Sequence, residues 1–166
     1  MTTVRLIADD LTGALDSAAQ FTGHAPLPVL LHGEPPYPSG SYALDLSCRD
    51  GTEAAAVASA RASLPSFLGS AIAFKKIDSL LRGHWAAEIA ALVAASVFRQ
   101  IVLAPAFPDQ GRKTIGGIQW LMGIDGSRRS VPVEPQFRLA QHGVAVHQGL
   151  VEVTAKDART AVFVCD

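Results

Sequence analysis

The 166-residue sequence is short of the residues that build several kinds of site. Its two cysteines, Cys48 and Cys165, lie far apart and have no C-x-x-C partner, so nothing supports a disulfide framework or a structural zinc site. We expect two reduced thiols, as in cytosolic proteins. The five histidines do not cluster at the spacing of metal ligands. We therefore assign no metal site to this chain.

The sequence also lacks a large excess of positive or negative charge, and it lacks long apolar runs. The formal net charge is -1, which gives no sign of the basic surface that nucleic-acid binding needs. The start MTTVRLIADD has no cationic region followed by an apolar one, so we expect no signal peptide, and no apolar run approaches the ~20 residues of a membrane span. We expect a cytoplasmic protein with no nucleic-acid or membrane partner, and a small neutral or anionic metabolite as its ligand.

Standard nucleotide loops are absent as well. Neither GxxxxGK[ST] nor GxGxxG occurs in the sequence. We therefore assign no cofactor-binding residue to this chain.

Short apolar runs alternate with amphipathic or alanine-rich stretches along the chain. With 49% hydrophobic residues, the length fits one domain with a substantial core. Helical spacing occurs at Leu11, Leu15 and Ala18, again from Trp85 to Val93, and in residues 50–64, where Asp50 is the expected cap. Strands are expected at 4–8, 28–31, 42–46, 71–74, 100–104 and 161–165. The alternation predicts a three-layer α/β fold, a mostly parallel, Rossmann-like sheet with helices on both faces.

Three regions depart from this alternation. Residues 32–41 hold three prolines and two glycines and predict a surface loop. Residues 111–148 predict either an excursion over the active face or a partly mobile loop. The chain stops just after the apolar run 161–165, whereas a buried parallel strand normally leads into a covering helix, so we expect a truncated domain.

Polar residues gather where the predicted strands end. Ligands of open α/β sheets bind beyond the carboxyl ends of the strands, so these residues predict one binding mouth for a small hydroxylated anion. They are Asp9 and Asp10, then Ser47 and Arg49, then Lys75, Lys76, Asp78, Ser79 and Arg82, and finally Pro105, Phe107, Gly111 and Arg112.

The turn after the first strand has two interpretations. Asp10 accepts hydrogen bonds from substrate hydroxyls or serves as a general base, or else Asp10 or Thr12 only caps the following helix. One cap suffices for a helix, and the second carboxylate, Asp9, favours a site.

The run from Lys75 to Gly83 also has two interpretations. We expect the lysines to mark the exposed end of a strand, because a strand cannot bury both. Arg82 offers a planar fork for a carboxylate or phosphate, next to the amino end of a helix that starts near Gly83. The alternative is an internal ion pair of Asp78 with Lys76 or Arg82. Arg112 is either a second anion ligand or a solvated loop residue.

Three motifs carry a family resemblance. IADDLTGA at 7–14, KKIDSLLRG at 75–83 and APAFPDQGR followed by TIGG at 104–117 resemble the four-carbon acid sugar kinases. The resemblance runs from about Leu6 to the last residue and covers less than half of a full-length member. It implies ATP-dependent phosphorylation of a terminal hydroxyl of threonate, erythronate or 3-oxo-tetronate. It also implies that residues 1–166 are an incomplete acid-sugar-binding domain, inactive alone, and that ATP and Mg²⁺ bind mainly to a C-terminal domain absent from this chain.

The resemblance and the positions of the residues together give a predicted site. The motifs carry over the catalytic Asp10 and the substrate contacts Lys76, Asp78, Ser79, Arg82 and Gly83. Position adds Asp9, Thr12, Arg49 and Arg112 to the substrate contacts.

Two other functions remain open. One is a magnesium-dependent phosphohydrolase with Asp9 or Asp10 as nucleophile. That class needs carboxylates at i and i+2, whereas these are adjacent and expected to point to opposite sides. The other is a non-catalytic module that binds small anions.

Overall fold

The computed structural model describes residues 2–23, 25–31, 38–95, 98–130, 134–148 and 161–164. The chain divides into two compact units. The first consists of Met1–Asp78 with Gly83–Trp85, and the second of Ser79–Arg82 with Ala86–Asp166.

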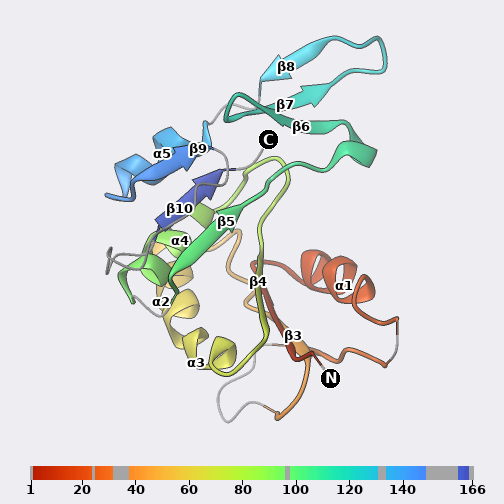
Figure 1. Cartoon of the computed structure of the whole chain (residues 1–166), viewed down its shortest axis with the longest axis vertical. Coiled ribbons are helices and arrows are strands. Elements are labelled where there is room, and N and C mark those ends of the chain that lie inside the picture. The colour runs from red at the N-terminus through yellow and green to blue at the C-terminus, as the bar shows by residue number, and fades with distance from the viewer. Residues whose placement is uncertain are drawn as a thin grey trace. The chain divides into compact units, whose positions relative to one another are not determined.

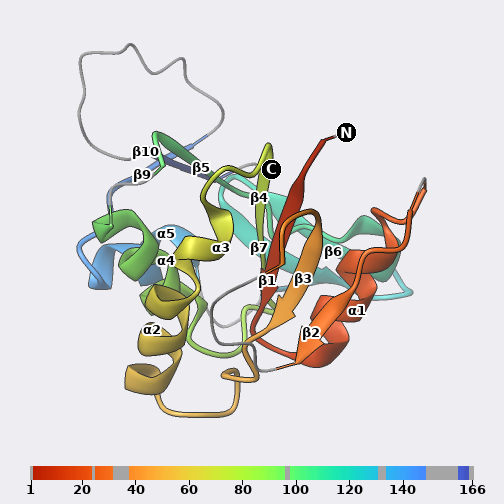
Figure 2. The same ribbon diagram turned by 90° about the horizontal axis from the view of Figure 1, so that it is seen from below.

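The first unit is built on a parallel four-stranded sheet, in the order β2-β3-β1-β4. Its strands are β1 (Val4–Ala8), β2 (Val29–Leu31), β3 (Tyr42–Asp45) and β4 (Ile72–Lys76). Helix α1 (Leu11–Ala19) joins β1 to β2, while α2 (Glu53–Ala62) and α3 (Leu64–Phe67) join β3 to β4. The two crossovers run in opposite directions across the sheet, and crossovers are right-handed, so α1 covers one face and α2 with α3 the other (Figures 1 and 2).

Helix α1 lies close to the sheet because its inner face carries small residues. Gly13, Ala14, Ser17 and Ala18 are buried, and Ala14 and Ala18 belong to one core cluster with residues of β1 and β3 such as Leu6 and Ala43. The helix predicted from the spacing of Leu11, Leu15 and Ala18 is confirmed, although Leu11 and Leu15 are 40% and 51% exposed. Close helix–sheet packing leaves no room for two leucines on that side.

Two predicted details of the first unit need correction. The prediction that Asp50 caps α2 is wrong: Thr52 is the cap, and its side chain accepts a 3.2 Å hydrogen bond from the Ala55 amide. A cap must directly precede the first helical residue for its oxygen to reach that amide. The expectation that β4 ends before the lysines is also wrong, since Lys75 and Lys76 pair with β1. Within the first unit β4 is an edge strand, and both lysines are only half-buried.

The second unit contains a parallel sheet of three strands, in the order β5-β10-β9. These are β5 (Gln100–Leu103), β9 (Val146–Gln148) and β10 (Ala161–Val164), and α5 (Pro135–Gln141) precedes β9. Helix α4 (Trp85–Ala94) starts at the last residue of the first unit. Its residues Trp85, Ile89 and Leu92 are buried, which confirms the predicted apolar stripe.

Residues 111–148 hold an antiparallel sheet that the sequence did not predict. After a 3₁₀ turn, η1 (Pro108–Gln110), the strands β6 (Arg112–Ile115), β7 (Ile118–Met122) and β8 (Arg128–Ser130) form a meander (Figure 1). Gly116 and Gly117, with φ of 61° and 76°, make the two-residue turn between β6 and β7. Two glycines with positive φ are typical of the two-residue turn of a tight β-hairpin.

The predicted α/β class with a mostly parallel sheet is confirmed, with this antiparallel meander added. No helix in the described part of the chain is both long and apolar enough to span a bilayer. Residues 32–37 of the predicted loop and Cys165 of the last predicted strand lie outside the described residues.

Candidate functional site

The carboxyl ends of β1 and β3 bring Asp9 and Arg49 together. The strands pair in register with Ala8 opposite Asp45, and the chain leaving β3 then bonds to the end of β1. The amides of Cys48 and Arg49 donate to the Asp9 carbonyl at 2.9 and 3.1 Å. Residues 40 positions apart are thus fixed side by side by the sheet and its exit loop.

The Arg49 guanidinium bridges two adjacent carboxylates. Its Nε and Nη2 donate to Asp9 Oδ2 and Oδ1 at 2.9 and 2.7 Å. Its Nη1 and Nη2 donate to Asp10 Oδ2 and Oδ1 at 2.5 and 2.8 Å. The expectation that the two carboxylates point to opposite sides is therefore wrong. Asp10 is extended as the chain leaves the strand, and the planar fork of Arg49 reaches both side chains.

The carboxylates around Arg49 keep its guanidinium charged although the group is largely buried. The Asp9 carboxylate is fully buried, and Arg49 is 12% exposed. Burial alone would lower the pKa of the Arg49 guanidinium, but its hydrogen bond to Asp9 and the charges of Asp9, Asp10 and Asp78 outweigh that effect and raise the pKa. Arg49 is therefore a permanent cation at the base of the site.

Asp10 also caps α1. Its Oδ1 accepts a 2.8 Å hydrogen bond from the Gly13 amide, which confirms the capping interpretation for Asp10, while Thr12 is exposed. A Cβ on Gly13 would lie 2.6 Å from Asp10 Oδ1 and 3.1 Å from Lys76 Cγ. Lys76 therefore lies beside the capped end of α1, and its Nζ donates to the Ile77 carbonyl.

Asp78 and Gly83 complete the group around Arg49 in the first unit. Asp78 is buried, and its Oδ1 is 4.0 Å from Arg49 Nη1, an ion pair that the sequence did not predict. Gly83 has φ of 78°, and a Cβ there would lie 3.0 Å from Arg49 Cγ and 3.5 Å from Asp9 Oδ2. A residue without a side chain is needed for so close an approach. Three carboxylates surround one guanidinium, which leaves an excess of negative charge.

The remaining predicted residues, Ser79, Arg82 and Arg112, belong to the second unit. Arg82 is exposed. Arg112 is half-buried, and its Nη1 donates to the carbonyl of Gln110 at 3.0 Å and to the Gln110 side chain. The sequence did not predict this partner, which ties Arg112 to η1. That these residues share one mouth with Asp10 stays a prediction.

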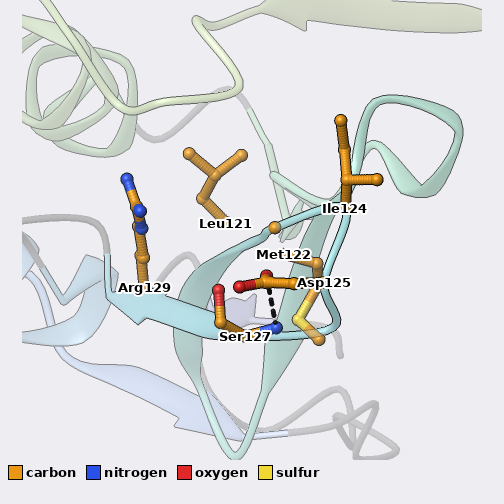
Figure 3. A pocket seen from close by; sticks show the side chains of 7 residues that line it. Leu121, Met122, Ile124, Asp125, Ser127 and Arg129 are labelled. Atoms are coloured by element: carbon orange, nitrogen blue, oxygen red, sulfur yellow. Dashed lines mark hydrogen bonds between the residues drawn. The ribbon is translucent and has the colours of Figure 1, made fainter.

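A shallow depression of about 400 Å³ lies elsewhere in the second unit, along the β7–β8 hairpin (Figure 3). In the turn of this hairpin Ile124 is fully exposed, and Asp125 Oδ1 accepts a 3.0 Å hydrogen bond from the Ser127 amide. Hydrogen bonds from the Ser127 side chain and amide lower the pKa of the Asp125 carboxyl. None of the predicted site residues lines this depression.

Metal binding can be assessed for the described residues. Among them, no three or more His, Cys, Asp or Glu side chains are grouped so that they could hold a metal ion. The carboxylates around Arg49 are therefore not arranged as the ligands of a metal ion.

The match to a family model covers nearly the whole chain. Residues 4–164 match the family described as "Sugar-binding N-terminal domain". A D-threonate kinase of Cupriavidus necator is 39% identical over 124 residues, which are 71% of this chain and 29% of that protein. The chain therefore spans less than a third of this curated relative. The relationship predicted from the three motifs is confirmed.

Solved structures share the fold. Two crystal forms of a domain of unknown function from Bordetella bronchiseptica, described as a domain-swapped dimer with bound citrate, give TM-scores of 0.70 and 0.68 at 23% and 24% identity. They match 97% and 98% of this chain and 46% and 48% of theirs. A putative tRNA synthase from Salmonella typhimurium LT2 gives 0.71 at 18% identity, over 98% of this chain and 47% of that one. Such low identities establish the fold alone.

Proposed function

The chain belongs to the family of sugar-binding N-terminal domains, and on that premise we propose that it binds the substrate of a four-carbon acid sugar kinase. The full-length protein would transfer a phosphoryl group from ATP to a terminal hydroxyl of threonate, erythronate or 3-oxo-tetronate. The observation that carries the proposal is the cluster of Asp10, Asp78 and Gly83 around Arg49. It lies where β1 and β3 end, the edge at which open α/β sheets bind ligands.

Asp10 is the proposed catalytic residue. Its carboxylate is 27% exposed, whereas that of Asp9 is fully buried. Each carboxylate oxygen can accept two hydrogen bonds, and Oδ2 of Asp10 has one partner, Arg49 Nη1. That oxygen can accept a bond from a substrate hydroxyl and take its proton as the phosphoryl group is transferred. Asp9 contributes by holding Arg49.

The other proposed contacts divide by chemistry. The forks of Arg82 and Arg112 suit the substrate carboxylate, and Lys76 adds positive charge. The hydroxyls of Ser79 and Thr12 suit the polyol. Gly83 and Asp78 shape the wall around Arg49. Phosphoryl transfer depends mostly on such positioning and on charge stabilisation.

We propose that ATP and Mg²⁺ bind to a further domain of the full-length protein. The sequence has no standard phosphate loop, and the described residues offer no metal-ligand group. The chain alone then binds acid sugar without phosphorylating it. We propose a cytoplasmic location, where ATP and such metabolites occur.

Calorimetric titration of the chain with D-threonate and with ATP, each alone, tests the proposal. Binding of threonate or another four-carbon acid sugar without binding of ATP is the expected result. Failure to bind any of these acids contradicts it. Phosphate release from sugar phosphates with Mg²⁺ alone would instead support a phosphohydrolase, a function for which the buried, Arg49-bonded Asp9 is badly placed as nucleophile.

A further inference from the structure

A fully buried glutamine in the second unit ties three segments together. Gln119, on β7, donates from Nε2 to the Ser79 carbonyl and to the Pro105 carbonyl, both at 3.0 Å. Its Oε1 accepts a 2.7 Å bond from the hydroxyl of Thr114, its cross-strand neighbour on β6. One side chain therefore links the meander to the Ser79–Arg82 segment and to the loop after β5.

The partners fix the orientation of the Gln119 amide. Backbone carbonyls can only accept, so the nitrogen must face Ser79 and Pro105, and both of its protons are used. Removing this amide would leave the buried Pro105 acceptor and the part-buried Ser79 acceptor without these donors. Such losses are costly, because the groups have already given up water.

The segment held by Gln119 has an uncommon backbone conformation. Leu81 is buried with φ of 58°, in the left-handed region that a residue with a branched side chain rarely enters. Strained backbone of this kind persists only where the surrounding structure over-determines it. The Gln119 bond to Ser79, two residues earlier in the chain, is such a constraint.

We propose that Gln119 is a positioning residue that holds the Ser79–Arg82 segment in the conformation that presents Ser79 and Arg82 to the acid sugar. Gln119 does not itself contact the substrate and acts only through its hydrogen bond to the Ser79 carbonyl. The inference rests on the proposed function, because that function assigns the acid sugar to Ser79 and Arg82.

The decisive variant is Gln119→Met, which keeps the length of the side chain and removes both donors. Thr114→Val is the matched control: it removes the third hydrogen bond of the same amide and leaves the two bonds to Ser79 and Pro105. Two readouts are needed. Hydrogen–deuterium exchange of the amides in 80–82, without ligand, reports how tightly the segment is held. Calorimetric titration with D-threonate reports the consequence for binding.

Gln119→Met is expected to speed exchange in 80–82 and to weaken threonate binding by about tenfold or more. Thr114→Val is expected to change neither by more than about twofold. In an Arg82→Ala background, Gln119→Met should weaken binding less than it does in the native chain, because the contribution of Arg82 is already lost. Equal exchange rates in Gln119→Met and in the native chain overturn the inference. An equal loss of affinity in Gln119→Met and in Thr114→Val also overturns it.

Two further outcomes are informative. If Gln119→Met does not fold, exchange in the native chain decides: amides 80–82 should open only with global unfolding, and easy local opening overturns the inference. If the native chain binds no acid sugar while Gln119→Met still loosens 80–82, the proposed function fails, and with it the assignment to substrate. The exchange result then identifies Gln119 as a purely structural clamp.

Discussion

Arg49 donates two hydrogen bonds to Asp9, from Nε to Oδ2 at 2.9 Å and from Nη2 to Oδ1 at 2.7 Å, and the Asp9 carboxylate has no exposed surface. A carboxylate so placed depends on its cation, because a buried charge without a partner is costly. The pair therefore fixes the end of β1 to the exit of β3, and with them the base of the candidate site.

Removal of that cation should destabilise the chain strongly. We expect Arg49→Ala to lower the free energy of unfolding by about 3–5 kcal/mol, because it leaves Asp9 buried without a partner. Urea denaturation at neutral pH measures the effect. Since the pKa of Arg49 is raised, its contribution is fully present below the pKa of the unfolded chain and is lost only as a strongly alkaline pH passes the folded value.

Arg61 is the matched control for this change. It is an exposed arginine in the last turn of α2, and Arg61→Ala should cost no more than about 0.5 kcal/mol. An equal cost for the two variants would show that the Arg49 bonds are not needed for stability.

Gly13→Ala tests the packing at the start of α1. Alanine in place of glycine normally stabilises a helix by about 0.5–1 kcal/mol. Here the new Cβ would lie 2.6 Å from Asp10 Oδ1, so we expect a net loss of about 1–3 kcal/mol instead. In an Asp10→Ala background the loss should shrink, because the nearest atom is gone. A stabilising Gly13→Ala would refute the close approach.

Gly83→Ala tests the wall beside Arg49, and Gly69→Ala is its control. Both glycines have left-handed φ, 78° and 73°, but only Gly83 would bring its Cβ near other atoms, 3.0 Å from Arg49 Cγ. The conformational cost of about 1–2 kcal/mol should appear in both variants. The additional loss of unfolding free energy in Gly83→Ala measures the contact of the new Cβ with Arg49. An equal loss in the two variants would mean that Arg49 does not lie beside Gly83.

The titration of Asp125 in the β7–β8 turn can be followed by carbon-detected NMR. Ser127→Ala removes the side-chain hydrogen bond that contributes most to the lowered pKa of Asp125, so the titration midpoint should move upward. The native turn gains stability above the unfolded pKa of this carboxyl and loses it as pH falls through the folded value. Ile124→Ala, a change in the same turn, should leave the midpoint in place. An unmoved midpoint in Ser127→Ala would contradict the assignment.

The sequence predicted the strands of the first unit well because their pattern is local. The run from Val4 to Ala8 is apolar except for Arg5 and contains the β-branched Val4 and Ile7, and β1 has those bounds. The extent of β4 was predicted poorly because the edge position that tolerates Lys75 and Lys76 depends on strand order. Strand order is a property of the whole sheet, which no local pattern contains.

The site could be predicted by residue type but not by partner. Arg49 was expected to bind substrate, and the structure commits four of its hydrogen bonds to Asp9 and Asp10. That pairing spans 40 residues and follows only from the register of β1 and β3. The role of Gln119 could not be predicted, because its two carbonyl partners lie 40 and 14 residues away along the chain.

We propose that the chain binds an acid sugar through the carboxylate of the sugar, and Arg82→Ala tests this proposal most directly. Calorimetric titration of the native chain and of Arg82→Ala with D-threonate should give binding for the first and at least about tenfold weaker binding for the second. Urea denaturation of both proteins, measured in parallel, separates a loss of affinity from a loss of stability. Equal affinities in the two proteins, or no binding by the native chain, would contradict the account.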